Sequence, residues 1–350
     1  MSLFDSIKKC SSYECQQAES SEEFEEHISS VATADEITVF KTASGDWLYR
    51  LNDDQDSAVI VSTDYQRIMK RAHNSDDPRI DQFLLRTAFE CRFCWEGILS
   101  LHAACVEKDS FAVAFTGHSG MGKSTRAKAW VDGLGAEWIS GDRPAVRLEK
   151  NGSVACGVPW DGKEQIHRNV ERPLLAILDV RRSHCNYLRK LTEEQALAVL
   201  MRQVFIPMWD TDTAVMAFRN VQTLIRKTPV YRVFCGPDVE SAEAIYDILF
   251  NHPEKIRKEA EEMKIKDGFV LRNVVDEFVV MPTGDNIAKF DGAVVLNEVS
   301  AFVFNMLKNA VSREDLLLAI LNEYDVAEET AQKDLDALLE QFRQMGLLEE

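Results

Sequence analysis

The chain has 350 residues, of which 45% are hydrophobic and 28% are charged, and this composition excludes pervasive disorder, collagen and a long coiled coil. At roughly 150 residues per domain, the length predicts two or three domains. The 40 Lys and Arg residues stand against 58 Asp and Glu residues, so the net charge is −18. A chain this acidic is not expected to bind nucleic acid.

The N-terminal segment carries Lys8 and Lys9 without an apolar run behind them. No stretch approaches the roughly 18 consecutive apolar residues that cross a membrane, so we expect a cytoplasmic protein with no membrane partner. Eight cysteines are scattered along the chain, and Cys91 and Cys94 lack a second pair at metal-site spacing. We therefore expect free core thiols instead of disulfides or a zinc site.

Residues 1–98 are predicted to form a small α+β region. The runs EITVFKTA, DWLYRLND and SAVIVSTD are rich in β-branched and aromatic residues and end in turn formers, which is typical of strands. The segment from Asp81 to Trp95 is predicted to be helical.

Residues 99–252 are predicted to form an α/β core, in which the apolar strands FAVAFT, AEWIS, LLAILDV and VYRVF alternate with helices. Thr192 and Gln195 form a capping box ahead of the helical run ALAVLMRQVF. A further helix is expected in DVESAEAIYDILF.

Residues 253–264 are highly charged, begin with a proline and are predicted to be a solvated linker, with a connecting helix as the alternative. Residues 265–350 then restart with the strand-like runs FVLRNVV, EFVVMPT and AKFDGAVVL. Amphipathic helical runs follow near 297–309, 312–323 and 327–345, so a separate β3α3 domain is expected. Its many acidic residues argue against an anionic ligand there.

The segment FAVAFTGHSGMGKST contains the motif Gly117-x4-Gly122-Lys123-Ser124 directly after an apolar strand and before a helical pattern. This is the P-loop arrangement, in which glycines let backbone N–H groups converge on phosphate oxygens at a helix N-terminus. Lys123 would pair with the β- and γ-phosphates, and Ser124 would hold Mg²⁺. Asp142, which follows a strand about twenty residues later, suits a second Mg²⁺ ligand, although a plain turn aspartate is the alternative.

The run LHAACVEKDSFAVAFTGHSGMGKSTRAKAWVDGLGAEWISGD resembles the HPr kinase/phosphorylase family, whose related fold includes ATP-dependent phosphoenolpyruvate carboxykinase. The stretch GVPWDGKE at residues 157–164 resembles a signature of small relatives in that family, and the likeness covers residues 100–250. The resemblance implies an ATP- and Mg²⁺-dependent kinase with His102 facing the transferred phosphate. The residues that it assigns to ATP and metal are Gly117, Ser119, Gly120, Met121, Gly122, Lys123, Ser124 and Thr125.

Two positions depart from that family. Gly141 and Asp142 stand where the family has two adjacent aspartates, and Ala103 follows the histidine in place of the usual glycine. The carboxylate that serves as general base in the family is therefore absent. Asp142, His102 and Glu164 are the candidates for that role, and a loose transition state that needs little base assistance is the alternative.

Residues 265–350, with runs such as GAVVLNEVSAFVFNML, resemble the PqqD-like peptide-binding domains of ribosomal peptide modification systems. That resemblance implies a winged-helix-like β3α3 domain in which a leader peptide adds a strand to the sheet edge and packs against the last helix. Groove residues are then expected on the strands and on the last helix, although most of them also suit a plain core. They are Phe269, Val270, Leu271, Phe278, Val279, Val280, Leu335, Leu338 and Leu339.

The resulting hypothesis is a kinase that transfers the γ-phosphoryl group of ATP to a Ser or Thr hydroxyl. The acceptor is a small protein or a precursor peptide that the C-terminal domain recruits through its leader segment. The first alternative is a catalytically weak nucleotide-binding module that delivers a precursor peptide to another modifying enzyme. The second is a small-molecule kinase, for instance on free serine. The sequence leaves a homo-oligomer open.

Overall fold

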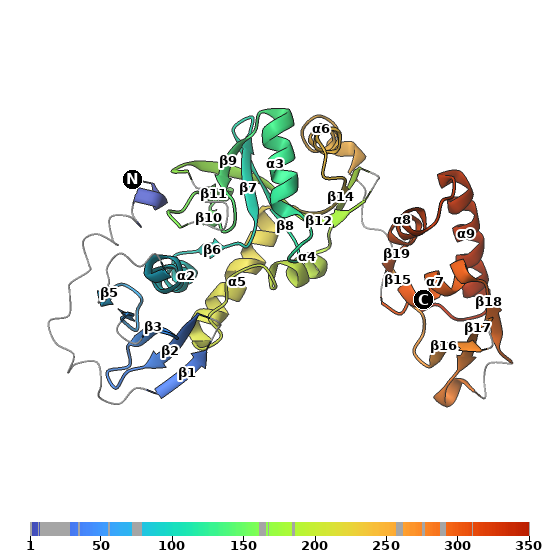
Figure 1. The fold of residues 1–350 in the computed structure, drawn as a ribbon, viewed down its shortest axis with the longest axis horizontal. Coiled ribbons are helices and arrows are strands. Elements are labelled where there is room, and N and C mark those ends of the chain that lie inside the picture. Colours follow the sequence, from blue (N-terminus) through green and yellow to red (C-terminus); the bar gives the residue numbers. More distant parts are fainter. Residues whose placement is uncertain are drawn as a thin grey trace. The chain divides into compact units, whose positions relative to one another are not determined.

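The computed structural model describes residues 2–5, 7, 29–33, 36–54, 57–71, 79–160, 166, 168–183, 186–256, 262–274, 277–287, 292–309 and 311–349. The chain divides into two compact units (Figure 1). The first comprises Met1–Arg182 and Asn186–Ile256, and the second comprises Ser183–Cys185 and Arg257–Glu350. The division does not separate residues 1–98 from the core that follows.

An antiparallel five-stranded sheet opens the first unit, in the order β1-β2-β3-β4-β5. Its strands are β1 (Ser29–Thr33), β2 (Ile37–Lys41), β3 (Trp47–Leu51), β4 (Ala58–Val61) and β5 (Ile68–Arg71). The π-helical turn η2 (Ile80–Leu85) and helix α2 (Arg86–Trp95) follow. Alternate apolar residues of the sheet pack against this helix in one core, which also contains Trp160.

A nine-stranded sheet forms the centre of the first unit. Its strands are β6 (Ile98–Ser100), β7 (Ala104–Lys108), β8 (Phe111–Thr116), β9 (Glu137–Ser140), β10 (Ala145–Glu149), β11 (Gly152–Cys156), β12 (Glu171–Arg182), β13 (Tyr187–Lys190) and β14 (Val230–Cys235). The long strand β12 lies between β8 and β14, and all three run parallel. The other pairings in this sheet are antiparallel, so the predicted α/β core is present as a mixed sheet.

Helices cover both faces of this sheet (Figure 1). The helices are α3 (Lys123–Leu134), α4 (Glu193–Leu200), α5 (Thr211–Lys227) and α6 (Val239–Tyr246), which continues into η3 (Asp247–Asn251). The apolar run of β8 explains the double cover, because Ala112 and Ala114 pack toward α4 and α5, whereas Val113 and Phe115 pack toward α3 and α6.

The capping box ahead of α4 is confirmed, because Thr192 Oγ1 accepts from Gln195 N and Gln195 Oε1 accepts from Thr192 N. The helix ends at Leu200, five residues before the end of the predicted run. Beyond that point the chain turns, and Val204 forms a β-bridge with Leu101. Pairing with the strand segment thus ends the helix earlier than its apolar pattern predicts.

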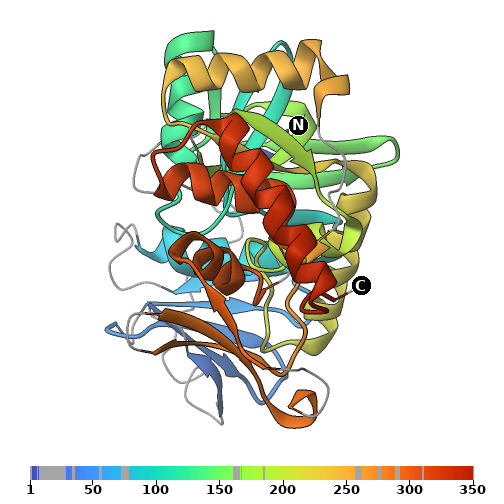
Figure 2. The same cartoon turned by 90° about the vertical axis from the view of Figure 1, so that its right-hand side faces the viewer.

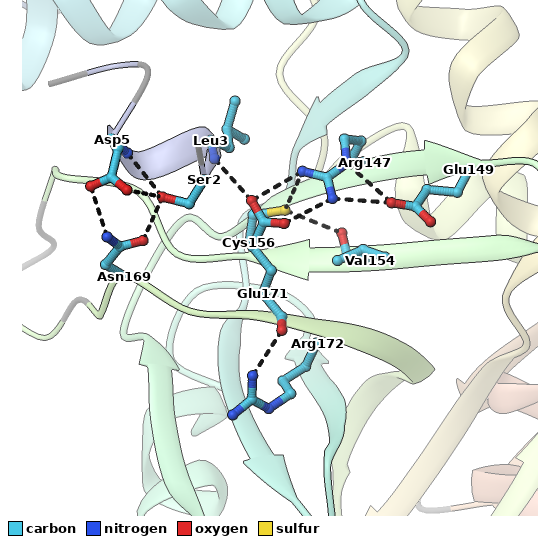
Figure 3. A network of polar contacts seen from close by, with 10 residues as sticks. All are labelled: Ser2, Leu3, Asp5, Arg147, Glu149, Val154, Cys156, Asn169, Glu171 and Arg172. Atoms are coloured by element: carbon cyan, nitrogen blue, oxygen red, sulfur yellow. Dashed lines mark hydrogen bonds and ion pairs between the residues drawn. The ribbon is translucent and has the colours of Figure 1, made fainter. Parts of the chain in front are cut away.

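A polar network holds the beginning of the chain against the central sheet (Figure 3). Leu3 N donates to Glu171 Oε1 at 2.9 Å, and Ser2 Oγ donates to the side chain of Asn169 at 2.7 Å. Arg147 pairs with Glu171 at 2.9 Å and lowers the pKa of that carboxyl group. The first turn of the chain is therefore part of the folded unit.

The second unit contains a three-stranded antiparallel sheet, β16 (Phe269–Val274), β17 (Glu277–Pro282) and β18 (Val294–Leu296), in that spatial order. Helices α7 (Glu298–Met306), α8 (Arg313–Glu323) and α9 (Glu328–Gln344) gather against one face of this sheet (Figure 2). Strands β15 (Glu262–Met263) and β19 (Val311–Ser312) pair separately. The three predicted helices and the first two predicted strands are thus observed. The third predicted strand, AKFDGAVVL, is observed only over Val294–Leu296, and its residues 288–291 lie outside the described residues.

The predicted linker is partly ordered where the structure describes it. The 3₁₀ turn η4 covers Pro253–Lys255, and β15 begins inside the predicted linker at Glu262. The pairing of β15 with β19 explains why its apolar residue Met263 is buried in spite of the charged surroundings.

Within the described ranges, no helix is both long and apolar enough to span a bilayer. Cys91, Cys94, Cys105, Cys156 and Cys235 are buried free thiols. For these positions the expectation of core thiols is confirmed. Trp160 is likewise a packed core residue, with its ring about 6 Å from those of Phe89 and Phe93.

Candidate functional site

The glycine-rich segment after β8 forms a tight loop that leads directly into α3. Gly117 and Gly122 adopt φ values of 137° and 85°, which residues with a side chain rarely adopt. Gly122 is the N-cap of α3, and no side chain caps this helix end. The first N–H groups of α3 are therefore oriented toward the mouth of the loop, where an anion would be favourable.

Three cationic side chains hold the loop in shape. Lys123 Nζ donates to the carbonyl of Gly117 at 3.1 Å, which places the ammonium group across the loop. The buried Arg126 donates to the carbonyls of Met121 at 3.0 Å and Cys235 at 2.8 Å, and so connects the loop to the end of β14. Arg182 donates to the Gly120 carbonyl at 2.6 Å from the end of β12. These bonds fix the loop backbone without occupying its N–H groups.

Strand directions explain why His102 and Asp142 meet at this loop. Strands β8 and β9 both pair antiparallel with β7, so the ends of β8 and β9 and the beginning of β7 share one edge of the sheet. Asp142 follows β9, and His102 precedes β7. Their side chains approach to 3.4 Å between His102 Nε2 and Asp142 Oδ1, and each is 35% exposed, so both can reach a ligand.

Main-chain hydrogen bonds fix the position of His102. Its N–H donates to the carbonyl of Gln203 at 2.7 Å, and its carbonyl accepts from Thr116 Oγ1 at 2.9 Å. The next residue, Ala103, donates its N–H to the Asp142 carbonyl at 2.8 Å. The residue after the histidine thus joins the two segments through its backbone, which does not require a glycine.

The electrostatics of the site favour a neutral histidine. Burial lowers the pKa of His102, the nearby Lys123 ammonium lowers it further, and Asp142 opposes both effects. Burial also lowers the pKa of Lys123, while Asp142 raises it. Since both groups respond to Asp142, the three side chains form one electrostatically connected site.

Arg143 connects Asp142 to a carboxylate of helix α2. Arg143 Nε lies 3.9 Å from Asp142 Oδ2, and its Nη1 lies 3.7 Å from the buried Glu90 Oε1. Ser100 Oγ also donates to Glu90 at 2.6 Å. Helix α2 therefore orients Arg143, which in turn lies against the carboxylate that faces the loop.

The donor set at this edge suits Mg²⁺. Ser124 lies in the first turn of α3 and is partly accessible, and Asp142 offers a carboxylate at the same edge of the sheet. Across the described residues, no group of three or more His, Cys, Asp or Glu side chains is placed to hold a metal ion. One hydroxyl and one carboxylate are nevertheless enough for Mg²⁺, which usually retains waters and substrate phosphates as its other ligands.

The structure therefore brings together most of the residues that the sequence analysis selected. The loop residues from Gly117 to Thr125, His102 and Asp142 gather at one sheet edge. Ser119, Gly120 and Thr125 are exposed, and Met121 is partly exposed. Glu164 lies outside the described residues, so its candidacy as a base stays a prediction.

Asp179 is a residue that sequence reasoning missed. It lies in register with Thr116 on the strand next to β8, and its Oδ1 would lie 3.5 Å from a Cβ atom placed on Gly117. The sequence signal was the aspartate that directly follows the apolar residues of the predicted strand LLAILDV. Its carboxylate is buried and pairs with Arg181 at 2.8 Å and Arg232 at 3.3 Å.

A small pocket of about 160 Å³ lies beside the first residues of the loop. It is lined by Gly117 and His118 from the loop, by Asp179 and Arg181 of β12, by Arg232 of β14, and by residues of α4 and the turn that follows it. The last group includes Arg202 and Gln203. Three arginines at one small opening were not anticipated from the sequence.

In the second unit, the pleat divides the predicted groove residues between two faces. Phe269, Leu271, Phe278 and Val280 pack into the helical core, as do Leu335, Leu338 and Leu339. Val270 and Val279 alternate with the inward-facing strand residues and so lie on the other face of the sheet. For these two residues the expected groove position is wrong, because successive residues of a strand point to opposite sides.

An apolar pocket of about 410 Å³ lies between the helices of the second unit. Its lining comes from the N-terminus of α7, the end of α8 and one side of α9, and includes Val299, Tyr324, Leu335 and Leu338. Asn297, which follows β18 directly, also lines it. One edge of β18 pairs with β17. The other edge pairs with no strand among the described residues.

Comparison with known proteins supports the C-terminal part of the resemblance. Residues 277–348 match the family of coenzyme PQQ synthesis protein D (PqqD), which confirms a PqqD-like domain at the C-terminus. A structure of TbiB1 in complex with the TbiA(beta) leader peptide is 27% identical, covers 25% of this chain and 94% of that chain, and gives a TM-score of 0.22. No curated protein matches the chain.

A structure of the Hpr(Ser) kinase/phosphatase from Coxiella burnetii is 13% identical, covers 45% of this chain and 97% of that chain, and gives a TM-score of 0.27. At these TM-scores, neither structural likeness carries an inference about function.

Proposed function

We propose that the protein is an ATP- and Mg²⁺-dependent kinase that phosphorylates a Ser or Thr hydroxyl of a precursor peptide recruited by its second unit. The observation that carries this proposal is the convergence of Lys123, His102 and Asp142 on one glycine-rich loop at an uncapped helix N-terminus. The PqqD-like match of residues 277–348 supplies the connection to a peptide.

The residues of the first unit suit phosphoryl transfer. Lys123 and the first N–H groups of α3 would neutralise charge on the phosphates, and Ser124 and Asp142 would hold Mg²⁺. The bound Mg²⁺ would supply further charge neutralisation. The acceptor oxygen forms a bond to the γ-phosphorus as the bond to the β–γ bridging oxygen breaks, and the products are ADP and a phosphate monoester.

We propose that His102 is the general base, which accepts the proton of the acceptor hydroxyl. Its lowered pKa keeps the imidazole neutral near pH 7, so one ring nitrogen can accept a proton. Asp142 lies 3.4 Å from Nε2 and would stabilise the imidazolium that results. This division of roles leaves Asp142 as the metal ligand and makes up for the missing first aspartate at Gly141.

Recruitment in the second unit is proposed to use the free edge of β18. A leader peptide that pairs with this edge would follow the strand toward Asn297, which lines the apolar pocket beside α9. Main-chain hydrogen bonds would provide affinity, and the pocket would select an apolar side chain.

Mass spectrometry of a co-encoded precursor peptide tests this function. The peptide is incubated with ATP, Mg²⁺ and the full-length protein, and we expect one phosphate on a Ser or Thr residue. Omission of Mg²⁺ and the Asp142→Asn variant should each abolish most of the product. A wild-type protein that binds both ATP and the peptide without forming any phosphopeptide would refute the kinase proposal.

The glycine at position 141 favours one alternative function. Without a carboxylate there, the first unit could bind nucleotide and act as a weak or inactive module that delivers the peptide to another enzyme. That alternative predicts that nucleotide changes peptide affinity while no phosphate is transferred. The same incubation with a calorimetric measurement of peptide binding therefore distinguishes the two functions.

A further inference from the structure

The three arginines beside the loop form a cationic pocket within an acidic protein. Arg181, Arg202 and Arg232 contribute three positive charges against the single carboxylate of Asp179, so the net charge of the lining is +2. The chain as a whole has a net charge of −18. A local excess of this sign in a pocket of about 160 Å³ favours a small anion.

The pocket keeps hydrogen-bond donors for a ligand. Asp179 is 1% exposed and fixes Arg181 and Arg232 by one contact each, at 2.8 Å and 3.3 Å. A guanidinium group has five N–H donors, so these two arginines are oriented but not saturated. Arg202 is exposed and has no side-chain partner among the described residues. Asp179 is therefore a positioning residue for the cationic wall.

A second observation points to a ligand in the same pocket. Gln203 belongs to its lining. The Gln203 side chain is only 7% exposed, and its Oε1 has no hydrogen-bond partner in the described part of the chain. A buried amide oxygen without a donor is costly unless a ligand satisfies it. The lining of the pocket thus combines cationic donors with a buried amide oxygen that lacks a partner among the described residues.

The pocket adjoins the phosphate-binding loop and the histidine. Gly117 belongs to both the loop and the pocket lining, and the carbonyl of Gln203 accepts the N–H of His102 at 2.7 Å. A group held in the pocket would therefore lie next to the loop mouth and to the residue that we assign as proton acceptor. In the proposed reaction, this position suits a group of the phosphate acceptor.

We propose that this pocket binds a carboxylate of the acceptor, so that the kinase selects hydroxyls that lie close to a carboxylate. This inference rests on the proposed kinase function. Arginine donors match a planar carboxylate, and the oxygen of Gln203 would accept from an N–H or O–H of the same acceptor. The carboxylate belongs to an acidic side chain next to the Ser or Thr, to the C-terminus of the peptide, or to a free hydroxy amino acid.

Binding measurements test the pocket without relying on catalysis. The full-length protein is loaded with Mg²⁺ and a non-hydrolysable ATP analogue, and calorimetry compares a Ser-Asp peptide with its Ser-Asn counterpart, both with blocked ends. Two further comparisons identify the source of the carboxylate. The first compares a Ser-terminated peptide that has a free C-terminus with its amidated form, and the second compares free L-serine with L-serinamide. We expect at least one acid to bind about tenfold tighter than its amide, the effect of one charge-assisted hydrogen bond.

The Arg202→Gln variant should remove this preference for the acid. Because Arg202 is exposed, its replacement should spare the fold, which circular dichroism checks. Arg219→Gln, at an exposed position of α5 outside the pocket, is the matched control and should retain the preference. Equal binding of every acid and its amide, or an acid preference that survives in Arg202→Gln, would overturn the proposal.

The outcomes separate this inference from the kinase proposal. Phosphorylation of acid and amide peptides at equal rates would refute the carboxylate pocket and leave the kinase standing. Selective, Arg202-dependent binding of an acid without any phosphate transfer would support the pocket and refute the kinase. Finally, inorganic phosphate that competes for the pocket when acetate does not would overturn the assignment of a carboxylate in favour of a phosphate.

Discussion

The two units present different kinds of chemistry to their proposed ligands. In the first unit, charged and polar side chains from separate strand ends converge on one loop, so each contributes a specific atom. In the second unit, a strand edge and an apolar pocket would provide main-chain pairing and burial for the proposed peptide. A single substitution should therefore disable the first site almost completely, whereas the second should lose affinity in steps.

Replacement of Lys123 by Ala should have the largest effect. It removes the ammonium group that lies across the loop, and we expect phosphoryl transfer to fall at least about 10²-fold, as is typical when one electrostatic contact to the transition state is lost. The affinity for MgATP, measured by calorimetry, should fall as well. Lys128→Ala, at an exposed position of the same helix, is the control, and equal MgATP affinities in the wild type and Lys123→Ala would contradict the P-loop assignment.

A charge in the pocket of the second unit should lower the affinity for the peptide and leave the affinity for the nucleotide unchanged. Leu338→Asp replaces an apolar lining residue, and burial of a leucine side chain contributes about 1.5–3 kcal/mol, so peptide affinity should fall about tenfold or more. Fluorescence anisotropy with a labelled precursor peptide measures this change. Gln332→Asp on the same helix does not line the pocket and should bind the peptide normally; a normal affinity for Leu338→Asp would exclude this pocket.

Arg126 should matter for both stability and nucleotide binding. Arg126→Gln leaves the carbonyls of Met121 and Cys235 without their charged donor, so we expect the free energy of unfolding to fall by about 1–3 kcal/mol in urea titrations. The affinity for MgATP should fall with it, since the loop loses its connection to β14. An Arg126→Gln protein with unchanged stability and unchanged MgATP affinity would show that the loop keeps its shape by other contacts.

The smallest effects concern the pKa of His102, and their signs differ between two variants. Burial and Lys123 lower this pKa and Asp142 raises it, so Lys123→Met should raise it and Asp142→Asn should lower it. Titration of the imidazole C–H resonances by NMR measures both shifts. Shifts of the same sign in the two variants would contradict the arrangement of the site.

The same pKa predicts a pH dependence of stability. The folded state binds the His102 proton less readily than the unfolded state, whose histidine titrates near pH 6.5. The stabilisation by neutral His102 is therefore complete above about pH 6.5 and is lost as the pH falls through the lower pKa of the folded state. In urea titrations, the free energy of unfolding should fall less in His102→Asn than in the wild type as the pH is lowered from 7 to the pH at which His102 titrates.

The sequence predicted the parts of the site that local patterns encode. The loop, its flanking strand and helix, and Asp142 after a strand all follow from residues close together in the chain. The pairing of Asp179 with Arg232 requires strand β14 to lie beside β12, and the contact of Gln203 with His102 requires the chain to return after α4. Such partners depend on non-local topology, which one sequence does not reveal.

A similar limit applies in the second unit. The apolar runs predicted its strands and helices, but the face of each strand residue depends on the register between strands. Val279 lies opposite Arg272 and Val295, on the face away from the helices, although its neighbours Phe278 and Val280 pack into the core. A continuous apolar run does not show which of its residues point inward.

Steady-state kinetics on one precursor peptide test most directly whether chemistry belongs to the first unit and recruitment to the second. Asp142→Asn should lower kcat about 10²-fold, because it removes the carboxylate that we assign to the metal. Leu338→Asp should raise the KM for the peptide and leave kcat nearly unchanged, as expected when only uniform substrate binding is lost. An Asp142→Asn protein with normal kcat, or a Leu338→Asp protein with lost turnover at saturating peptide, would contradict this division of roles.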